Sequence, residues 1–132
     1  MTKTLLLLAA FAPLAALASL SSAPVTAAAA AAPPPAPPAA FGPCATCHSV
    51  KKGERSGFGP NLFGVAGTRS GAIGGYAFSP AMKKADVVWN RDNLDRFIAA
   101  PQSVVPGTKM AYPGLKDPAK RKAIVDYLMA LK

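Results

Sequence analysis

The chain has 132 residues, with 15 lysine and arginine residues against 6 aspartate and glutamate residues, and a formal net charge of +9 at pH 7. A chain of this length forms at most one ordinary domain. Its positive charge favours acidic proteins or membrane surfaces as partners. Nucleic acid is not expected as a partner, because the few aromatic residues, 8% of the chain, form no interleaved stacking platform.

Residues 1–27 have the pattern of a secretory signal peptide. Lys3 is the only charge before a run of mostly leucine and alanine from Leu5 to Leu20, and small residues follow, as export signals require. Three cleavage sites fit, after Ala18, Ala23 and Ala27. We expect the mature protein in the periplasm. An uncleaved membrane anchor is the alternative, although the 16 residues from Leu5 to Leu20 are fewer than the roughly 20 that span a bilayer.

Residues 28–40 consist entirely of alanine and proline. Such a segment cannot bury a core, so we expect a semi-rigid spacer of about 3.1 Å per residue. The folded domain is then residues 41–132. Without Lys3, 14 basic residues oppose 6 acidic ones, a formal charge of +8. A domain this short is marginally stable unless something such as a bound cofactor reinforces it.

The only two cysteines, Cys44 and Cys47, lie in the sequence Cys-Ala-Thr-Cys-His that ends at His48. This is the attachment signature of haem c. Each thiol adds to one haem vinyl group, and the adjacent histidine is brought beneath the iron as a ligand. Haem attachment of this kind takes place outside the cytoplasm, in agreement with the expected signal peptide.

Three other interpretations of the two cysteines are weaker. A structural zinc site needs four ligands, but the chain has two cysteines and one histidine. A thioredoxin-like pair is expected in a βαβ unit, and the following sequence has no alternating strands. A disulfide between Cys44 and Cys47 would close a very short loop and stabilise little. One covalent haem c therefore remains the prediction.

Residues 53–75 contain eight of the eleven glycines and show neither helical nor strand periodicity. A long irregular segment in a compact domain usually needs a reason. Wrapping the backbone closely around a flat macrocycle is such a reason, because glycine permits close approach and unusual φ angles.

Two helices are expected in the rest of the domain. Residues 90–100 carry Leu94, Phe97 and Ile98 at helical spacing, and Asn90 or Asp92 can cap their start. Asp117 and Pro118 open the second helix as N-cap and first helical residue. Its apolar stripe is Ile124, Tyr127, Leu128 and Leu131, and the basic residues Lys120, Arg121 and Lys122 are expected on another face.

His48 is the only histidine, so a second axial ligand must be another residue type, and Met82, Met110 and Met129 are the candidates. Met129 lies in the periodic terminal helix, where packing explains it better. Met82 is possible, but nothing distinguishes it. Met110 lies in residues 105–114, where two prolines and two glycines shape a loop that can hold a thioether toward a metal. Because His/Met ligation is the pattern of electron-transfer cytochromes, we favour Met110.

From Phe41 to Lys132 the chain resembles the class I, mitochondrial-type cytochromes c and their bacterial relatives. The resemblance implies a small all-α class I cytochrome c fold, with short helices and long loops wrapped around one covalent haem. It rests on the haem motif and on the following landmarks: Gly59-Pro60-Asn61-Leu62, Gly74-Gly75-Tyr76, Trp89, Pro106-Gly107-Thr108-Lys109-Met110 and Tyr127-Leu128.

The resemblance also implies roles for single residues. Cys44 and Cys47 bear the thioether links, and His48 and Met110 are the axial ligands. The Pro60 carbonyl accepts the other ring N–H of the histidine and so fixes the ring. Three further residues match positions that hydrogen-bond a haem propionate: Ser79, Trp89 and Thr108.

The chain departs from the family pattern at several positions. Thr68 stands where an arginine is frequent, with Arg69 adjacent, and Met82 stands where asparagine is frequent. Phe78 and Phe97 occupy positions that are often tyrosine. Prolines crowd the usual N-terminal helix at Pro37, Pro38 and Pro43. At most a short turn is expected there, and with it a domain that is less stable without haem than its relatives.

The expected function is single-electron transfer in an electron transport chain, such as a respiratory chain, by a monomer that is not an enzyme. Transient partners would be acidic redox proteins, such as a membrane reductase and an oxidase, with membrane contact only if the signal is retained. Five lysines could guide docking: Lys51, Lys52, Lys83, Lys84 and Lys109. A haem peroxidase or ligand-binding sensor with an open iron site is the rival, but a second histidine that would favour it is missing.

Overall fold

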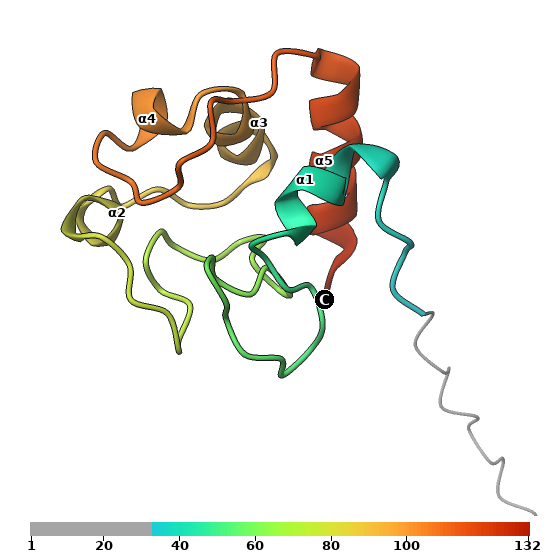
Figure 1. The fold of residues 1–132 in the computed structure, drawn as a ribbon, viewed down its shortest axis with the longest axis horizontal. Helices are drawn as coiled ribbons and strands as arrows, with labels where there is room; N and C mark the ends of the chain where they lie inside the picture. Colours follow the sequence, from blue (N-terminus) through green and yellow to red (C-terminus); the bar gives the residue numbers. More distant parts are fainter. Residues whose placement is uncertain (1–32) are drawn as a thin grey trace, which may run out of the picture. The chain divides into compact units, whose positions relative to one another are not determined.

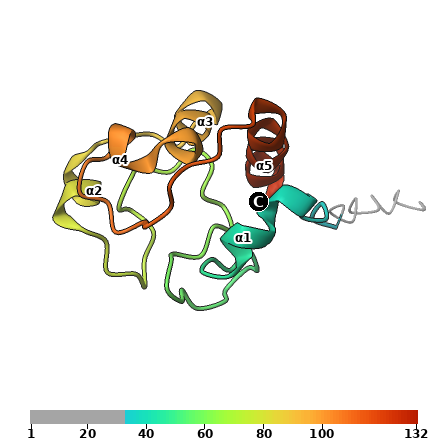
Figure 2. The same cartoon turned by 45° about the horizontal axis from the view of Figure 1, so that its top comes forward.

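The computed structural model describes residues 33–132. The expected signal peptide, residues 1–27, and the first part of the spacer lie outside the described residues. The described chain forms six short helical elements (Figures 1 and 2): η1 (Ala39–Phe41), α1 (Gly42–Ala45), α2 (Pro80–Lys84), α3 (Arg91–Ala99), α4 (Pro101–Val104) and α5 (Pro118–Ala130).

The predicted all-α fold with long loops is confirmed for the described part of the chain. Its only β pairing is an isolated antiparallel bridge between Arg69 and Val88. None of the helices within residues 33–132 has the length and apolar character needed to cross a membrane.

Helices α3 and α5 begin where the sequence predicts. The Asn90 side chain accepts a hydrogen bond from the Asn93 N–H at 2.8 Å and caps α3. The Asp117 carboxylate accepts from the N–H groups of Ala119 and Lys120 at 3.0 and 3.1 Å and caps α5. The two helices pack against each other. Both helices are therefore stabilised in two ways: a polar side chain caps the first turn, and an apolar face is buried.

The predicted apolar stripe of α5 is buried, since Ile124, Tyr127, Leu128 and Leu131 are all at most 5% exposed. The prediction for the basic face was wrong at Arg121. Its side chain is only 15% exposed, and its Nε donates to Asp95 of α3 at 2.9 Å. Its Nη1 also donates to two loop carbonyl groups, those of Leu115 and Lys116. Arg121 thus lies toward α3 and joins the two helices, instead of lying on a separate basic face.

The N-terminal segment forms one 3₁₀ turn followed directly by one α-helical turn, slightly more than the single short turn expected. Pro43 is tolerated because it lies in the first turn of α1, where a backbone N–H has no helical partner. Element η1 packs against α5. Phe41 is 2% exposed, and its ring meets Tyr127 edge-on with the centroids 5.1 Å apart. This aromatic pair fixes the start of the domain to its last helix.

Two short helices, α2 and α4, were not predicted. The Ser79 hydroxyl accepts from the Met82 N–H at 3.1 Å and caps α2, whose first residue is Pro80. Pro101 ends α3, as expected, but it also begins α4. The irregular course expected for residues 53–75 is confirmed. Gly71 in this segment has φ +72°, and an added Cβ would lie 3.0 Å from the Lys83 Cα, so the loop passes directly against α2.

Candidate functional site

A cavity of about 520 Å³ lies inside the domain. Its wall is mostly apolar and brings together the cysteine motif, the glycine-rich segment, α2, α3, residues 108–112 and α5. Several core side chains form part of the wall, among them Trp89, Leu94, Phe97 and Leu128. Apolar walls with a few polar groups are typical of a cofactor site.

His48 enters this cavity with its orientation fixed. Its Nδ1 lies 2.8 Å from the Pro60 carbonyl oxygen, which can only accept, so Nδ1 carries the ring proton and Nε2 keeps its lone pair. Burial lowers the pKa of His48, and the Pro60 contact opposes this in part. A Cβ added at Gly59 would lie 2.5 Å from the His48 Cε1, so the ring rests directly on that backbone. The result is a neutral imidazole with a free nitrogen.

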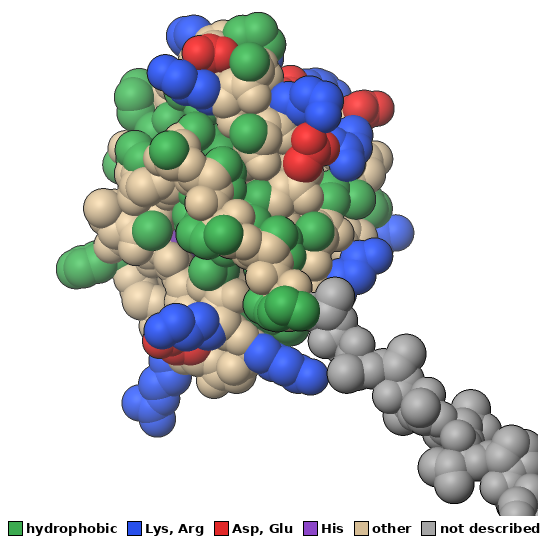
Figure 3. Space-filling model, turned by 90° about the vertical axis from the view of Figure 1, so that its right-hand side faces the viewer, with side chains coloured by type: hydrophobic (Ala, Val, Ile, Leu, Met, Phe, Trp, Pro, Cys, Tyr) green, Lys and Arg blue, Asp and Glu red, His purple; other side chains and the backbone are tan. Residues whose placement is uncertain are grey.

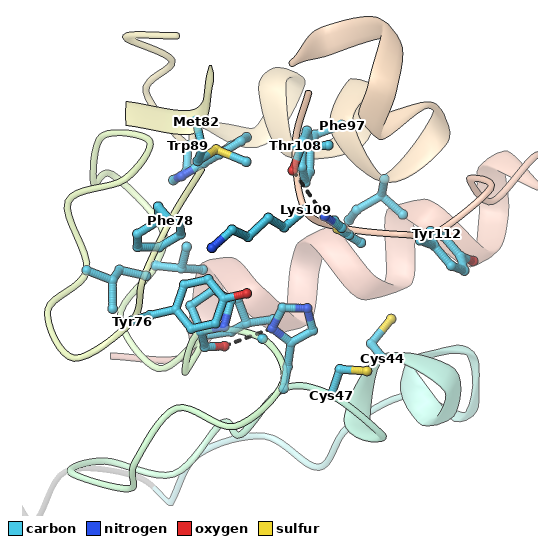
Figure 4. Close-up of a pocket in the computed structure, with 18 of the residues that line it drawn as sticks. Cys44, Cys47, Tyr76, Phe78, Met82, Trp89, Phe97, Thr108, Lys109 and Tyr112 are labelled. Carbon is cyan, nitrogen blue, oxygen red and sulfur yellow. Dashed lines mark hydrogen bonds between the residues drawn. The ribbon is translucent and has the colours of Figure 1, made fainter. Parts of the chain in front are cut away.

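Cys44 and Cys47 are free thiols at the edge of the same cavity. The N–H groups of Cys47 and His48 both donate to the Cys44 carbonyl, at 3.1 and 3.0 Å. This turn brings the two sulfur atoms to the same side of the cavity (Figure 4). Burial raises the pKa of the Cys44 thiol, with a smaller contribution from Cys47. Nowhere in residues 33–132 do three or more His, Cys, Asp or Glu side chains group to hold a metal ion by themselves.

Two of the three candidate methionines line the cavity. Met82 is 7% exposed and lies beside Trp89 (Figure 4). Met110 is half-buried, and its N–H donates to the Thr108 hydroxyl at 3.3 Å. Met129 packs against the core from α5 and is absent from the described cavity wall.

The three residues matched to propionate contacts all belong to this wall. Ser79, Trp89 and Thr108 are 5%, 7% and 8% exposed. Each hydroxyl accepts one backbone hydrogen bond, but neither donates to a described residue, and the indole N–H has no acceptor there. No sealed side-chain nitrogen or oxygen in the described region lacks a partner, so the indole nitrogen must border open space. Three donors in the cavity wall that lack an acceptor fit an acidic group inside the cavity.

Two contacts at the rim join distant segments and were not predicted from the sequence. The Tyr76 hydroxyl donates to the Phe58 carbonyl at 2.9 Å, and the Lys109 ammonium donates to the Ala77 carbonyl at 2.6 Å. Lys109 extends between Tyr76 and Thr108 in Figure 4. Tyr112, also missed, lies on the side of the two cysteines. For Tyr76 and Tyr112 the available signal was an aromatic residue next to glycine or proline. This signal does not indicate which segments of the chain meet.

The positions that depart from the family pattern are largely apolar in the structure. Phe97 packs on Trp89 and Phe78 packs on Tyr76, each with ring centroids 4.9 Å apart. Arg69 borders the cavity, and its guanidinium pairs with the exposed carboxylate of Asp86.

Comparison with known proteins identifies the class. No protein-family model matches the chain. Cytochrome c2 iso-2 of Magnetospirillum fulvum is 44% identical over 92 residues, which are 70% of this chain and 95% of that protein. Cytochrome c2 of Rhodopila globiformis is 49% identical over 89 residues, which are 67% of this chain and 83% of that protein.

A solved structure agrees. Cytochrome cH from Methylobacterium extorquens is 46% identical, with a TM-score of 0.64, and the match covers 67% of this chain and 89% of that chain. The fold and these relatives define a small all-α electron carrier. The chain belongs to the class I cytochrome c family. Cytochromes c carry electrons and are not enzymes, and the family implies covalent haem c and redox protein partners.

Proposed function

We propose that the chain is an extracytoplasmic single-electron carrier with one haem c, bound through Cys44 and Cys47 and ligated by His48 and Met110. When bound, haem c supplies an iron that alternates between Fe(III) and Fe(II). The observation that carries the proposal is the neutral His48 ring, whose free Nε2 faces an apolar cavity edged by two free thiols. Two thiols, an imidazole and a thioether that all line one apolar cavity match this donor set.

Pro60 and Gly59 hold the imidazole ready for ligation. The Pro60 carbonyl accepts the Nδ1 proton and so fixes the tautomer and makes Nε2 more basic, as partners of metal-bound histidines do. Gly59 allows the ring to lie flat on the backbone. The ring therefore needs little rearrangement to act as a ligand.

Two observations favour Met110 over Met82 as the second ligand. Met110 lies on an irregular segment, and its N–H is anchored to the Thr108 hydroxyl. Met82 is fixed inside α2 and belongs to the buried core. A half-buried thioether on a shaped loop is the better candidate, because it can turn to a metal without disturbing a helix. Ser79, Trp89 and Thr108 would then donate to a haem propionate.

We further propose that residues 1–27 are a signal peptide, 28–40 a spacer and 41–132 the cytochrome domain, which acts as a monomer in the periplasm. Mass spectrometry of the mature N-terminus separates cleavage from a retained anchor. The partners are acidic redox proteins, because the chain without Lys3 carries a formal net charge of +8. Electron transfer to them should slow steeply as ionic strength rises.

The optical spectrum tests the proposed ligands. We expect the oxidised protein, matured in a haem-competent host, to show the weak absorbance near the red end that reports a methionine–iron bond. Met110→Ala should abolish this band, whereas the matched controls Met82→Ala and Met129→Ala should keep it. A colourless protein would refute the haem. A coloured protein whose band survives Met110→Ala would refute only the sixth ligand, and carbon monoxide binding at neutral pH would favour an open iron site.

A further inference from the structure

Phe58 projects into solvent at the rim of the cavity. The residue is 89% exposed, and it is the large hydrophobic residue left exposed in the described chain. It also belongs to the cavity wall. Single exposed apolar residues are ordinary on protein surfaces, so exposure alone carries no conclusion. Two further features distinguish Phe58: its backbone is held by hydrogen bonds, and the neighbouring surface is basic.

The backbone around Phe58 is fixed by three hydrogen bonds. The Gly57 N–H donates to the Gly59 carbonyl at 3.0 Å, and the Gly59 N–H donates to the Cys47 carbonyl at 2.9 Å. The Tyr76 hydroxyl donates to the Phe58 carbonyl at 2.9 Å. The ring is therefore presented from a rigid turn, and little conformational entropy would be lost if a partner contacted it.

The surface beside this turn is basic. Lys51, Lys52 and Arg55 are exposed, and Glu54 is the only acidic residue among residues 51–60. The Asn61 side chain donates to the carbonyls of Lys51 and Glu54, each at 2.8 Å, and so ties this segment to the Phe58 turn. Figure 3 shows several basic side chains and one acidic group at the lower end of the described domain.

We propose that Phe58 is the apolar anchor with which this carrier docks onto an acidic redox protein. The ring enters an apolar recess on the partner, and the neighbouring cations Lys51, Lys52 and Arg55 face carboxylates around it. An aromatic anchor inside a charged rim is how binding energy concentrates in protein interfaces. Because redox interfaces are small, a single buried ring contributes a large share of the binding free energy. The inference rests on the proposed electron-carrier function and adds the contact that places the partner beside Gly59 and His48.

The test uses the haem-loaded protein with detergent-solubilised cytochrome c oxidase as the acidic partner, over a range of ionic strengths. We expect Phe58→Ala to raise KM at least fivefold with a smaller change in kcat, and Phe58→Leu to raise it less. Arg55→Gln is the charge control, and its effect on KM should vanish at high ionic strength, whereas that of Phe58→Ala should persist. The midpoint potential and the optical spectrum should match the wild type in all three variants.

An unchanged KM in Phe58→Ala would overturn the anchor and leave electron transfer by the wild type intact. A raised KM with a shifted potential or spectrum would overturn it too, since the ring would then cover the cofactor edge. Analytical ultracentrifugation gives a third outcome. If the wild type is a dimer and Phe58→Ala is a monomer, the anchor is overturned, because Phe58 would then bind a second copy of this chain and not a redox partner. A wild type that exchanges no electrons with the oxidase would overturn the anchor together with the proposed function.

Discussion

Replacing Gly59 with alanine should strongly destabilise the domain through a single clash. The new Cβ would lie 2.5 Å from the Cε1, 2.7 Å from the Nδ1 and 3.0 Å from the Nε2 of His48. These distances are far below van der Waals contact, so the ring must move. It cannot do so freely, because its Nδ1 donates to the Pro60 carbonyl at 2.8 Å.

The expected loss has two parts. Forcing an extra methyl group into a packed site costs about 1–3 kcal/mol, and breaking the hydrogen bond from His48 to Pro60 costs about 0.5–1.5 kcal/mol. Together they predict a loss of about 1.5–4.5 kcal/mol in the free energy of unfolding. In a domain of this size, this lowers Tm by about 6–36 °C, at about 4–8 °C per kcal/mol.

Gly57→Ala is the matched control on the same turn. Its Cβ would meet only the Cys47 carbonyl oxygen, at 3.6 Å, an ordinary contact. Its stability should change by less than about 1 kcal/mol. Thermal and urea unfolding of both haem-loaded variants, followed by circular dichroism, make the comparison. If Gly59→Ala is as stable as Gly57→Ala, the imidazole does not lie against this backbone and the geometry of the site is wrong.

Two further changes probe the helices that support the site. Phe41→Ala removes a ring that is 2% exposed and packed on Tyr127, so urea unfolding should show a loss of about 3–5 kcal/mol; a loss below about 1 kcal/mol would mean that the N-terminal turn is dispensable. The pKa of Asp117 is lowered chiefly by the hydrogen bond it accepts from the Lys120 N–H. Its contribution to stability is therefore present above the unfolded-state pKa of about 3.9 and lost as the pH falls through the lower folded-state pKa. The Tm difference between the wild type and Asp117→Asn should shrink over that acidic range, and a difference independent of pH would contradict the cap.

The sequence predicts those parts of the fold that local patterns encode. Helices α3 and α5 are long enough for apolar periodicity, and Asn90 and Asp117 mark their starts. Helices α2 and α4 have five and four residues, too few to show a period. The sequence contains one signal for α2: Ser79, a capping residue, stands directly before Pro80. Short helices of this kind are stabilised by tertiary packing and not by their own sequence.

The residues of the site also fall into those that local sequence predicts and those that only tertiary packing brings together. Cys44, Cys47 and His48 are neighbours in sequence, so their chemistry is legible without a structure. The contacts that shape the cavity rim are not local: Lys109 reaches Ala77 across 32 positions of the chain. Arg121 shows the same limit, because its partner Asp95 lies 26 residues away on another helix. Which distant segments meet is decided by the packing of the whole domain, and here by the cavity around which it forms.

The size of that cavity makes the cofactor part of the core. Trp89, Leu94, Phe97, Ile124 and Leu128 are core residues, yet each of them also lines the cavity. Because these side chains surround a cavity of about 520 Å³, they lack packing partners on that side unless a cofactor supplies them, and the contacts of a packed core are lost. A Cys44→Ala, Cys47→Ala variant purified without haem should therefore lack the circular dichroism of a folded helical domain at 25 °C and show no cooperative melting. A cooperative transition in that variant would mean that the polypeptide closes the cavity unaided, and that the cofactor serves redox chemistry without holding the fold together.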